Sequence, residues 1–285
     1  MEKQKNWGDN NMKKYTVISL SFDNDCNLKC AMCYKNKWVA DDEKADYSFW
    51  LDCIPYFKQI TDQIALGNGE VFLHPEFVGK FAERATKEGL IVNVTSNGKL
   101  TYDTDILKNI RMLSISLDRY KYSGPAGIKA YMGTTKHLSQ FTEIGCNLLM
   151  EEWMFRDYKW LVHMIHHLFK DAGVSRVFAL SPKNWDAPDI LKHQDVYKAL
   201  SLLFKHFYVD DLTQSIISNN SYENWKEPCH YARDMVSIDE CKNVMGCSFD
   251  EKPLMTLEKP SDILKIPTIK YKKRYSCPYL KIPGG

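Results

Sequence analysis

The sequence lacks several features that would place it in a specialised class of protein. No stretch approaches the ~20 consecutive apolar residues of a membrane-spanning helix, and residues 1–14 contain no apolar segment of the kind found in signal peptides. The formal net charge is only +2, so charge indicates neither a nucleic acid nor a membrane surface as partner. Low-complexity segments and short repeats are also lacking. These absences predict a globular, cytoplasmic protein.

Cysteine, in contrast, is abundant, with nine residues among 285. An odd number of cysteines in a reducing compartment favours metal binding over disulfide bonds. The cysteines fall into two groups: Cys26, Cys30 and Cys33, and then Cys229, Cys241, Cys247 and Cys277. Cys53 and Cys146 stand alone, and we expect each to be a small buried apolar residue.

Apolar strands alternate with helices six times between residues 15 and 207. The segment "YTVISLSF" (15–22) is typical of a buried strand, and "PEFVGKFAERATKEG" (75–89) is typical of an amphipathic helix. Such alternation predicts right-handed βαβ units and a parallel sheet. We therefore expect an α/β fold, a partial (β/α)6 barrel with its chemistry at the carboxyl ends of the strands.

Local details of this prediction concern three segments. We expect the helix at residues 47–61 to be interrupted at Pro55. We expect a strand at residues 146–155 and a helix at residues 189–207. Near residue 210 the pattern changes to short segments with cysteines. The predicted domains are therefore a polar tail (1–14), the barrel (15–210) and a small α+β domain (211–285).

The spacing of the first three cysteines favours an iron–sulfur cluster. Three thiolates can hold a 4Fe–4S cluster by three of its irons and leave the fourth iron open to a ligand. A structural zinc site would need a fourth protein ligand, and the nearest histidine, His74, is 41 residues beyond Cys33. Zinc is the alternative.

The segment "CNLKCAMC", directly after a predicted strand, resembles the CxxxCxxC signature of the radical SAM superfamily. The resemblance implies that Cys26, Cys30 and Cys33 bind a 4Fe–4S cluster whose open iron takes S-adenosylmethionine. It places Met32 near the adenine, with Tyr34 next to the motif. It also implies reductive cleavage to a 5′-deoxyadenosyl radical, hydrogen abstraction from a substrate, and an electron donor of the flavodoxin or ferredoxin type.

Polar residues at later strand ends extend this resemblance. "GNGE" (67–70) is similar to the Gly-Gly-Glu motif of the superfamily, in which Glu70 would accept a hydrogen bond from the substrate's ammonium group. "SNG" (96–98) and "SLD" (116–118) follow the next two strands. The expected cofactor contacts are Asn68, Gly69, Glu70, Ser96, Asn97, Ser116 and Asp118. Each of these residues would also suit a turn or a helix cap, and His74 is expected to be structural.

Two further sets of polar residues are candidates. Strand alternation would turn only one of Glu151 and Glu152 into the barrel mouth, and we take Glu152 as the candidate catalytic residue, with a structural salt bridge as the alternative. His163 and His167 share a helix face at a spacing that can bind metal, but a surface or packing role is the expected one.

The second cysteine group resembles the auxiliary-cluster extension known as SPASM or, in its shorter form, twitch. The resemblance implies a second 4Fe–4S cluster, bound by Cys229, Cys247 and Cys277. The usual final cysteine pair is missing, so Cys241 is the expected fourth ligand. The alternatives are a cluster with an open iron, or zinc or free thiols instead of a cluster.

The resemblance permits several functions. We expect a radical SAM oxidoreductase that oxidises or rearranges a small molecule such as an aminocyclitol or a sugar. A maturase that crosslinks or epimerises a ribosomal peptide is the alternative, although only 25 residues precede Cys26, too few for a leader-binding domain. Relatives that cyclise a nucleotide typically end in a pair of glycines, as this chain does in "PGG" (283–285), but they usually carry a close CxxC in the auxiliary set, which is lacking here. From another class, the rival is a non-catalytic iron–sulfur or zinc protein.

Overall fold

The computed structural model describes residues 15–31, 33, 46–119, 121–182, 188–250 and 252–278. The strands are β1 (Val17–Leu20), β2 (Gln63–Leu66), β3 (Ile91–Ser96), β4 (Met112–Leu117), β5 (Glu143–Leu149), β6 (Val174–Leu180), β7 (Phe207–Val209), β8 (Met235–Ile238), β9 (Asn243–Met245) and β10 (Met255–Thr256). The α-helices are α1 (Tyr47–Ile60), α2 (Pro75–Lys87), α3 (Thr104–Leu107), α4 (Gly124–Leu138), α5 (Glu152–Arg156), α6 (Tyr158–Lys170), α7 (Gln194–Leu203) and α8 (Asp211–Asn219). Two 3-10 helices, η2 (Val71–Leu73) and η3 (Pro260–Thr268), complete these elements.

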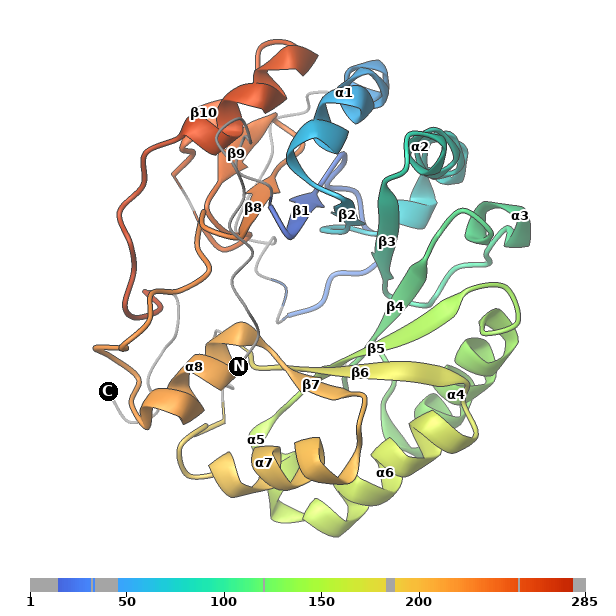
Figure 1. Cartoon of the computed structure of the whole chain (residues 1–285). Helices are drawn as coiled ribbons and strands as arrows, with labels where there is room; N and C mark the ends of the chain where they lie inside the picture. Colours follow the sequence, from blue (N-terminus) through green and yellow to red (C-terminus); the bar gives the residue numbers. More distant parts are fainter. Residues whose placement is uncertain are drawn as a thin grey trace.

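One curved sheet of ten strands organises the fold, in the order β10-β9-β8-β1-β2-β3-β4-β5-β6-β7. Strands β1 to β7 pair in parallel with their neighbours, as βαβ crossovers require. Helices α1, α2, α4, α6 and α7 lie on the outer side of the curved sheet (Figure 1). Its two edges, β10 and β7, are not paired with each other, so the barrel is partial. The predicted α/β class with a parallel-dominated sheet is confirmed.

The helix after β2 shows how the sequence sets these elements. Pro75 stands in the first turn of α2, where the missing N–H costs nothing, and Gly89 follows the helix with a positive φ of 77°. The face that carries Phe77 and Phe81 is buried, while Glu83 and Lys87 form an ion pair in solvent. Amphipathic helices of this kind cover the sheet and close the core.

Three local predictions were wrong. Helix α1 continues from Tyr47 to Ile60 through Pro55, because its inner face is anchored in the core by Trp50 and Phe57. The strand predicted at residues 146–155 is β5, which begins earlier, at Glu143, and ends at Leu149, so residues 152–156 form α5. The helix predicted at residues 189–207 ends at Leu203, and a seventh parallel strand, the three-residue β7, follows it.

The residues after 211 continue the same sheet. Strand β8 pairs in parallel with β1, with Val17 opposite Met235 and Leu20 opposite Ile238. Strands β9 and β10 then pair antiparallel beside it, and η3 packs against α1. The boundary predicted at residue 211 therefore falls in a chain that shares hydrogen bonds with the barrel, and it stays a prediction. Among the residues described, no helix is long and apolar enough to cross a membrane.

Candidate functional site

The loop after β1 carries the first three cysteines at the carboxyl edge of the sheet. Cys26 is exposed, while Cys30 and Cys33 are partly buried, and the Cys33 N–H donates to the Cys30 carbonyl (2.9 Å). Burial raises the pKa of the Cys30 thiol, Asp118 and the two neighbouring thiols add to the rise, and Lys121 opposes it. The Cys30 thiol therefore lies close enough to the other two thiols to interact with them electrostatically, beside a lysine that favours its ionised form.

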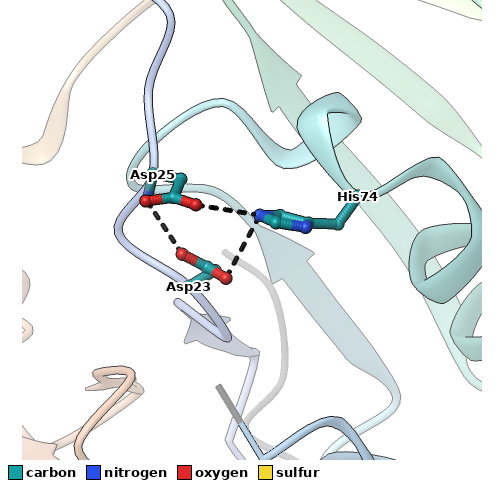
Figure 2. Close-up of side chains that lie close together, drawn as sticks. All are labelled: Asp23, Asp25 and His74. Atoms are coloured by element: carbon teal, nitrogen blue, oxygen red, sulfur yellow. Dashed lines mark hydrogen bonds and ion pairs between the residues drawn. The ribbon is translucent and has the colours of Figure 1, made fainter. Parts of the chain in front are cut away.

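Three side chains hold this loop against the segment that follows β2. His74 Nε2 lies 3.2 Å from an Asp23 oxygen and 3.4 Å from an Asp25 oxygen, and the Asp25 N–H donates to Asp23 (2.9 Å) (Figure 2). Tyr47, at the start of α1, donates its hydroxyl to Oδ2 of Asp23 (2.9 Å), the same oxygen that His74 approaches. The contacts tie the loop between β1 and Cys26 to two neighbouring elements, which supports a structural role for His74.

Gly69 permits a close approach of two backbones under the cysteine loop. Its φ is +95°, and a Cβ there would lie 2.6 Å from the Asp25 carbonyl oxygen. The next N–H, that of Glu70, donates to this carbonyl (2.7 Å). Asn68 also has a positive φ, and its carbonyl lies 3.5 Å from the Ser21 hydroxyl. Asn68 and Gly69, predicted as cofactor contacts, thus lie directly against the loop that bears the thiols.

Glu70 joins the ends of β2 and β3. Its side chain is buried, with 1% of the residue exposed, and it accepts hydrogen bonds from the Phe72 N–H (3.2 Å), the Ser96 hydroxyl (2.9 and 3.0 Å) and the Asn97 N–H (2.7 Å). Burial raises the pKa of this carboxyl, and the hydrogen bonds oppose the rise. Protein donors therefore already surround the carboxylate, and its predicted contact with a ligand stays a prediction.

Asn97 links the third strand to the cysteine loop. Its amide nitrogen donates to the Asn27 side-chain oxygen (2.8 Å) and lies 4.0 Å from the Cys26 sulfur, while its oxygen accepts from the Lys99 N–H (2.9 Å). The structure thus brings together Asn97 and Cys26, which are 71 residues apart in sequence. A polar amide beside a thiolate can donate a hydrogen bond to the sulfur and stabilise its charge.

The end of β4 adds a buried ion pair. Asp118, 3% exposed, pairs with Lys121, and both residues influence the Cys30 thiol. Ser116 is half-buried two residues earlier on β4. Sequence reasoning missed Lys121, although its position three residues after Asp118 permits this pair. Lys121 is a cation close to the Cys30 thiol.

The two glutamates after β5 occupy different environments. Glu151 is buried, 2% exposed, and binds Arg119 (2.9 Å) and the indole N–H of Trp153 (3.1 Å). The predicted catalytic residue, Glu152, begins α5 with its side chain 38% exposed and lies 3.0 Å from His193 Nε2. Strand alternation does not select between them, because β5 has already ended at Leu149. The catalytic role of Glu152 stays a prediction.

The second cysteine group is divided by the β8–β9 hairpin. Near its open end, the Cys229 N–H donates to the Arg274 carbonyl (2.7 Å), and the Ala232 N–H donates to the carbonyl of Gly246, beside Cys247 (3.0 Å). Cys277 follows Arg274 on the same C-terminal segment. These contacts bring the backbones around Cys229, Cys247 and Cys277 together.

Cys241 lies at the other end of the hairpin, in its turn. This turn packs on the end of β1: Glu240 accepts from the Ser21 hydroxyl (3.0 Å), and Lys242 pairs with Asp46 (3.0 Å). Strand β9, three residues long, lies between Cys241 and Cys247 and spans about 10 Å at ~3.4 Å per residue. The geometry does not bring Cys241 to the other three cysteines, and its role as a ligand stays a prediction.

The spacing of the thiols bears on the type of metal. In the part of the chain that the structure describes, one group of three or more ligand atoms lies within 4.8 Å of one another: Asp23, Asp25 and His74. Tetrahedral zinc, with Zn–S bonds of ~2.3 Å, needs sulfur atoms about 3.8 Å apart. Neither cysteine group is that compact among the described residues. Predicted residues Met32, Tyr34 and 283–285 lie outside the described residues.

Comparisons with known proteins agree with the fold. No family model matches the chain. Over 107 residues it is 31% identical to the tungsten-containing aldehyde ferredoxin oxidoreductase cofactor-modifying protein of Pyrococcus furiosus. This match covers 36% of the chain and 29% of that protein, so the chain matches less than a third of the relative's length.

Two solved structures resemble most of the chain. SuiB of Streptococcus suis, bound to S-adenosylmethionine, has a TM-score of 0.69 at 10% identity, covering 84% of this chain and 61% of SuiB. The structure of anSMEcpe with bound AdoMet and the Cp18Cys peptide has a TM-score of 0.61 at 13% identity, covering 90% of this chain and 80% of that one. Two proteins solved with bound S-adenosylmethionine thus share the fold of this chain, and the predicted partial barrel is confirmed.

Proposed function

We propose that the chain is a radical SAM enzyme that abstracts a hydrogen atom from its substrate. One observation carries this proposal: three thiols share one loop at the carboxyl edge of a partial barrel, and Asn97 and Lys121 lie beside them. The fold match to proteins solved with S-adenosylmethionine supports it. A reducing cytoplasm and a flavodoxin or ferredoxin donor belong to the same proposal.

The described residues fit a 4Fe–4S cluster held by Cys26, Cys30 and Cys33. Such a cluster, with S-adenosylmethionine bound, supplies the one-electron cleavage that yields a 5′-deoxyadenosyl radical. The cation of Lys121 favours the thiolate of Cys30, and the amide of Asn97 holds the loop at Cys26. Buried Glu70 joins the ends of β2 and β3 beneath the loop by accepting hydrogen bonds from Ser96 and Asn97.

For the substrate we favour a peptide over the aminocyclitol or sugar expected from sequence. SuiB has been solved bound to its precursor peptide SuiA, with a TM-score of 0.66 and 95% of this chain covered. The anSMEcpe structure also contains a peptide. These two cases support a peptide substrate. A small molecule is the alternative, and the cofactor-modifying relative favours it.

We also propose that Cys229, Cys247 and Cys277 hold an auxiliary cluster with an open iron. Support comes from the backbone contacts that bring these three residues to one end of the β8–β9 hairpin, away from Cys241.

An anaerobic iron count with an assay for 5′-deoxyadenosine under dithionite tests the enzyme proposal. Wild type is compared with the triple variant Cys26→Ala, Cys30→Ala, Cys33→Ala, and with Cys53→Ala as a control from the buried core. We expect cleavage in wild type and in the control, and none in the triple variant. Cleavage that persists in the triple variant, or a filled cluster without cleavage in wild type, would overturn the proposal.

A peptide substrate is tested separately with the same protein. Peptides from a pooled library are incubated with the reduced enzyme and S-adenosylmethionine, and masses are compared with those from the triple variant. A mass change that needs the three cysteines supports a peptide substrate. Modification of sugars or aminocyclitols alone would instead return the assignment to a small molecule.

A further inference from the structure

A cavity of ≈ 570 Å³ lies between α4 and α6, next to the ends of β4 and β5. Leu148 of β5 forms part of its wall. Leu148 shares a face of the strand with Cys146, since side chains alternate, and Cys146 contacts Tyr131 of α4. The cavity therefore lies between the sheet and its helices, on the side of the sheet opposite the barrel interior.

The wall of the cavity is apolar and adaptable in shape. Three methionines contribute to it: Met132, Met154 and Met164. Their flexible thioethers fit irregular apolar surfaces. The rings of Trp153 and Trp160, which also line it, lie 5.1 Å apart and are tilted by 47°. A volume between ~300 and 1,000 Å³ is the usual size of a pocket for a small organic molecule.

The charged groups at the cavity are mostly basic, and all but one are paired. Asp118 is paired with Lys121, and Arg119 with Glu151. Lys129 is exposed and forms no ion pair with any of the described residues.

The two histidines of the cavity wall form a hydrogen bond with each other. His163 and His167 share a hydrogen bond between their Nε2 atoms (2.9 Å), and the Nδ1 atom of His167 contacts Asp171. The two histidines therefore add hydrogen-bonding groups to the rim of the cavity. The carboxylate beside them, Asp171, already contacts His167. Lys129 is therefore the charged side chain of the cavity wall that is available to pair with a ligand. Its positive charge favours an anionic group.

We propose that this cavity binds a small organic acid, with its apolar body among the methionines and tryptophans and its anionic group at Lys129. The inference needs neither the cluster nor S-adenosylmethionine, because neither cysteine group lines the cavity. It describes a second binding site, which can be present whether or not the proposed reaction is correct.

Three compounds test the site: 4-phenylbutyrate, 4-phenylbutanamide and 4-phenylbutylamine. They share a phenyl ring on a four-carbon chain and differ in the terminal group. Binding to the intact chain is measured by ligand-observed NMR titration, with and without S-adenosylmethionine. We expect the acid to bind about two- to fivefold tighter than the amide, the range of an exposed ion pair, and the amine to bind weakest. Equal affinities for the three heads, or no binding at millimolar concentration, would overturn the proposal.

Variants locate the binding. Met132→Trp and Ile128→Trp each fill the cavity from α4 and should weaken acid and amide alike. Lys129→Met should remove the preference for the acid and leave amide binding unchanged. Lys136→Met, two turns further along α4 and outside the cavity, is the matched control and should change nothing. Unchanged binding in both tryptophan variants, with helix content intact by circular dichroism, would contradict the site.

Discussion

The two cysteine groups differ in how the chain brings them together. Cys26, Cys30 and Cys33 lie on one loop, which Asp23, Asp25 and His74 hold in place. The second group reaches from Cys229 to Cys277, and a hairpin and a returning C-terminal segment must first form before three of its members approach. Local spacing can therefore reveal the first group, whereas the second depends on tertiary structure.

The largest expected effect concerns the two ends of the hairpin. Cys247→Ala should remove about half of the bound iron, if each group holds a four-iron cluster. Cys241→Ala should leave the iron content unchanged, because Cys241 lies at the turn. Colorimetric iron analysis of anaerobically purified protein measures both. Equal losses from the two variants would contradict the separation of Cys241 from the other three cysteines.

The stability of the loop that carries Cys26, Cys30 and Cys33 should depend on Gly69, which lies beneath it. Gly69→Ala places a Cβ 2.6 Å from the Asp25 carbonyl at a φ of +95°. We expect the free energy of unfolding to fall by about 2–4 kcal/mol, measured by urea denaturation. Gly133→Ala, within α4 and with nothing inside 4 Å of the new Cβ, is the control and should raise it by about 0.5–1 kcal/mol. Similar changes in both would show that the close approach is unimportant.

A smaller effect should follow from the buried network that supports the same edge. Ser96→Ala removes the hydroxyl between Glu70 and Tyr102 (2.8 Å to the latter) and leaves buried oxygens with fewer donors. The expected loss is about 1–3 kcal/mol of unfolding free energy. Ser114→Ala, at a buried serine on β4 without a side-chain hydrogen bond to the described residues, should cost less. If Ser114→Ala lowers the free energy of unfolding as much as Ser96→Ala does, the hydrogen bonds of Ser96 contribute no specific stability.

The smallest effect should come from the side-chain contacts that hold the loop. His74→Gln loses the contacts of the ring Nε2 with Asp23 and Asp25, so we expect a destabilisation of about 0.5–1 kcal/mol and faster loss of iron to a chelator. His166→Gln, on the exposed face of α6, should release iron at the wild-type rate. An unchanged rate in His74→Gln would mean that the backbone contacts alone hold the loop.

The difference between local patterns and tertiary contacts also explains which features the sequence could predict. Pro75, Gly89 and the amphipathic pattern between them place α2 correctly, because these signals are local. The thiols, Glu70, Ser96 and Asn97 were found at strand ends by motif, and they do meet at one edge of the sheet. The strand β7, only three residues long, was missed because it carries too little pattern to be separated from the preceding helix.

Contacts between distant segments were beyond the sequence. Nothing local shows that His74 meets Asp23, or that the turn at Cys241 packs on the end of β1. The choice of Glu152 over Glu151 rested on strand alternation, which fails once the chain has left the strand at Leu149. Such positions are set by packing of the whole sheet, and only the fold reveals them.

The pairing of β1 with both β2 and β8 has a consequence for biosynthesis. One side of β1 meets Ile64 to Leu66 soon after it leaves the ribosome, but the other side waits for Met235 to Ile238. At ~5–20 residues per second, this delay is roughly 10–40 s. Throughout that time the strand that leads into the first three cysteines is an open sheet edge, a known hazard for aggregation. This edge of β1 is therefore covered only after nearly the whole chain has been synthesised.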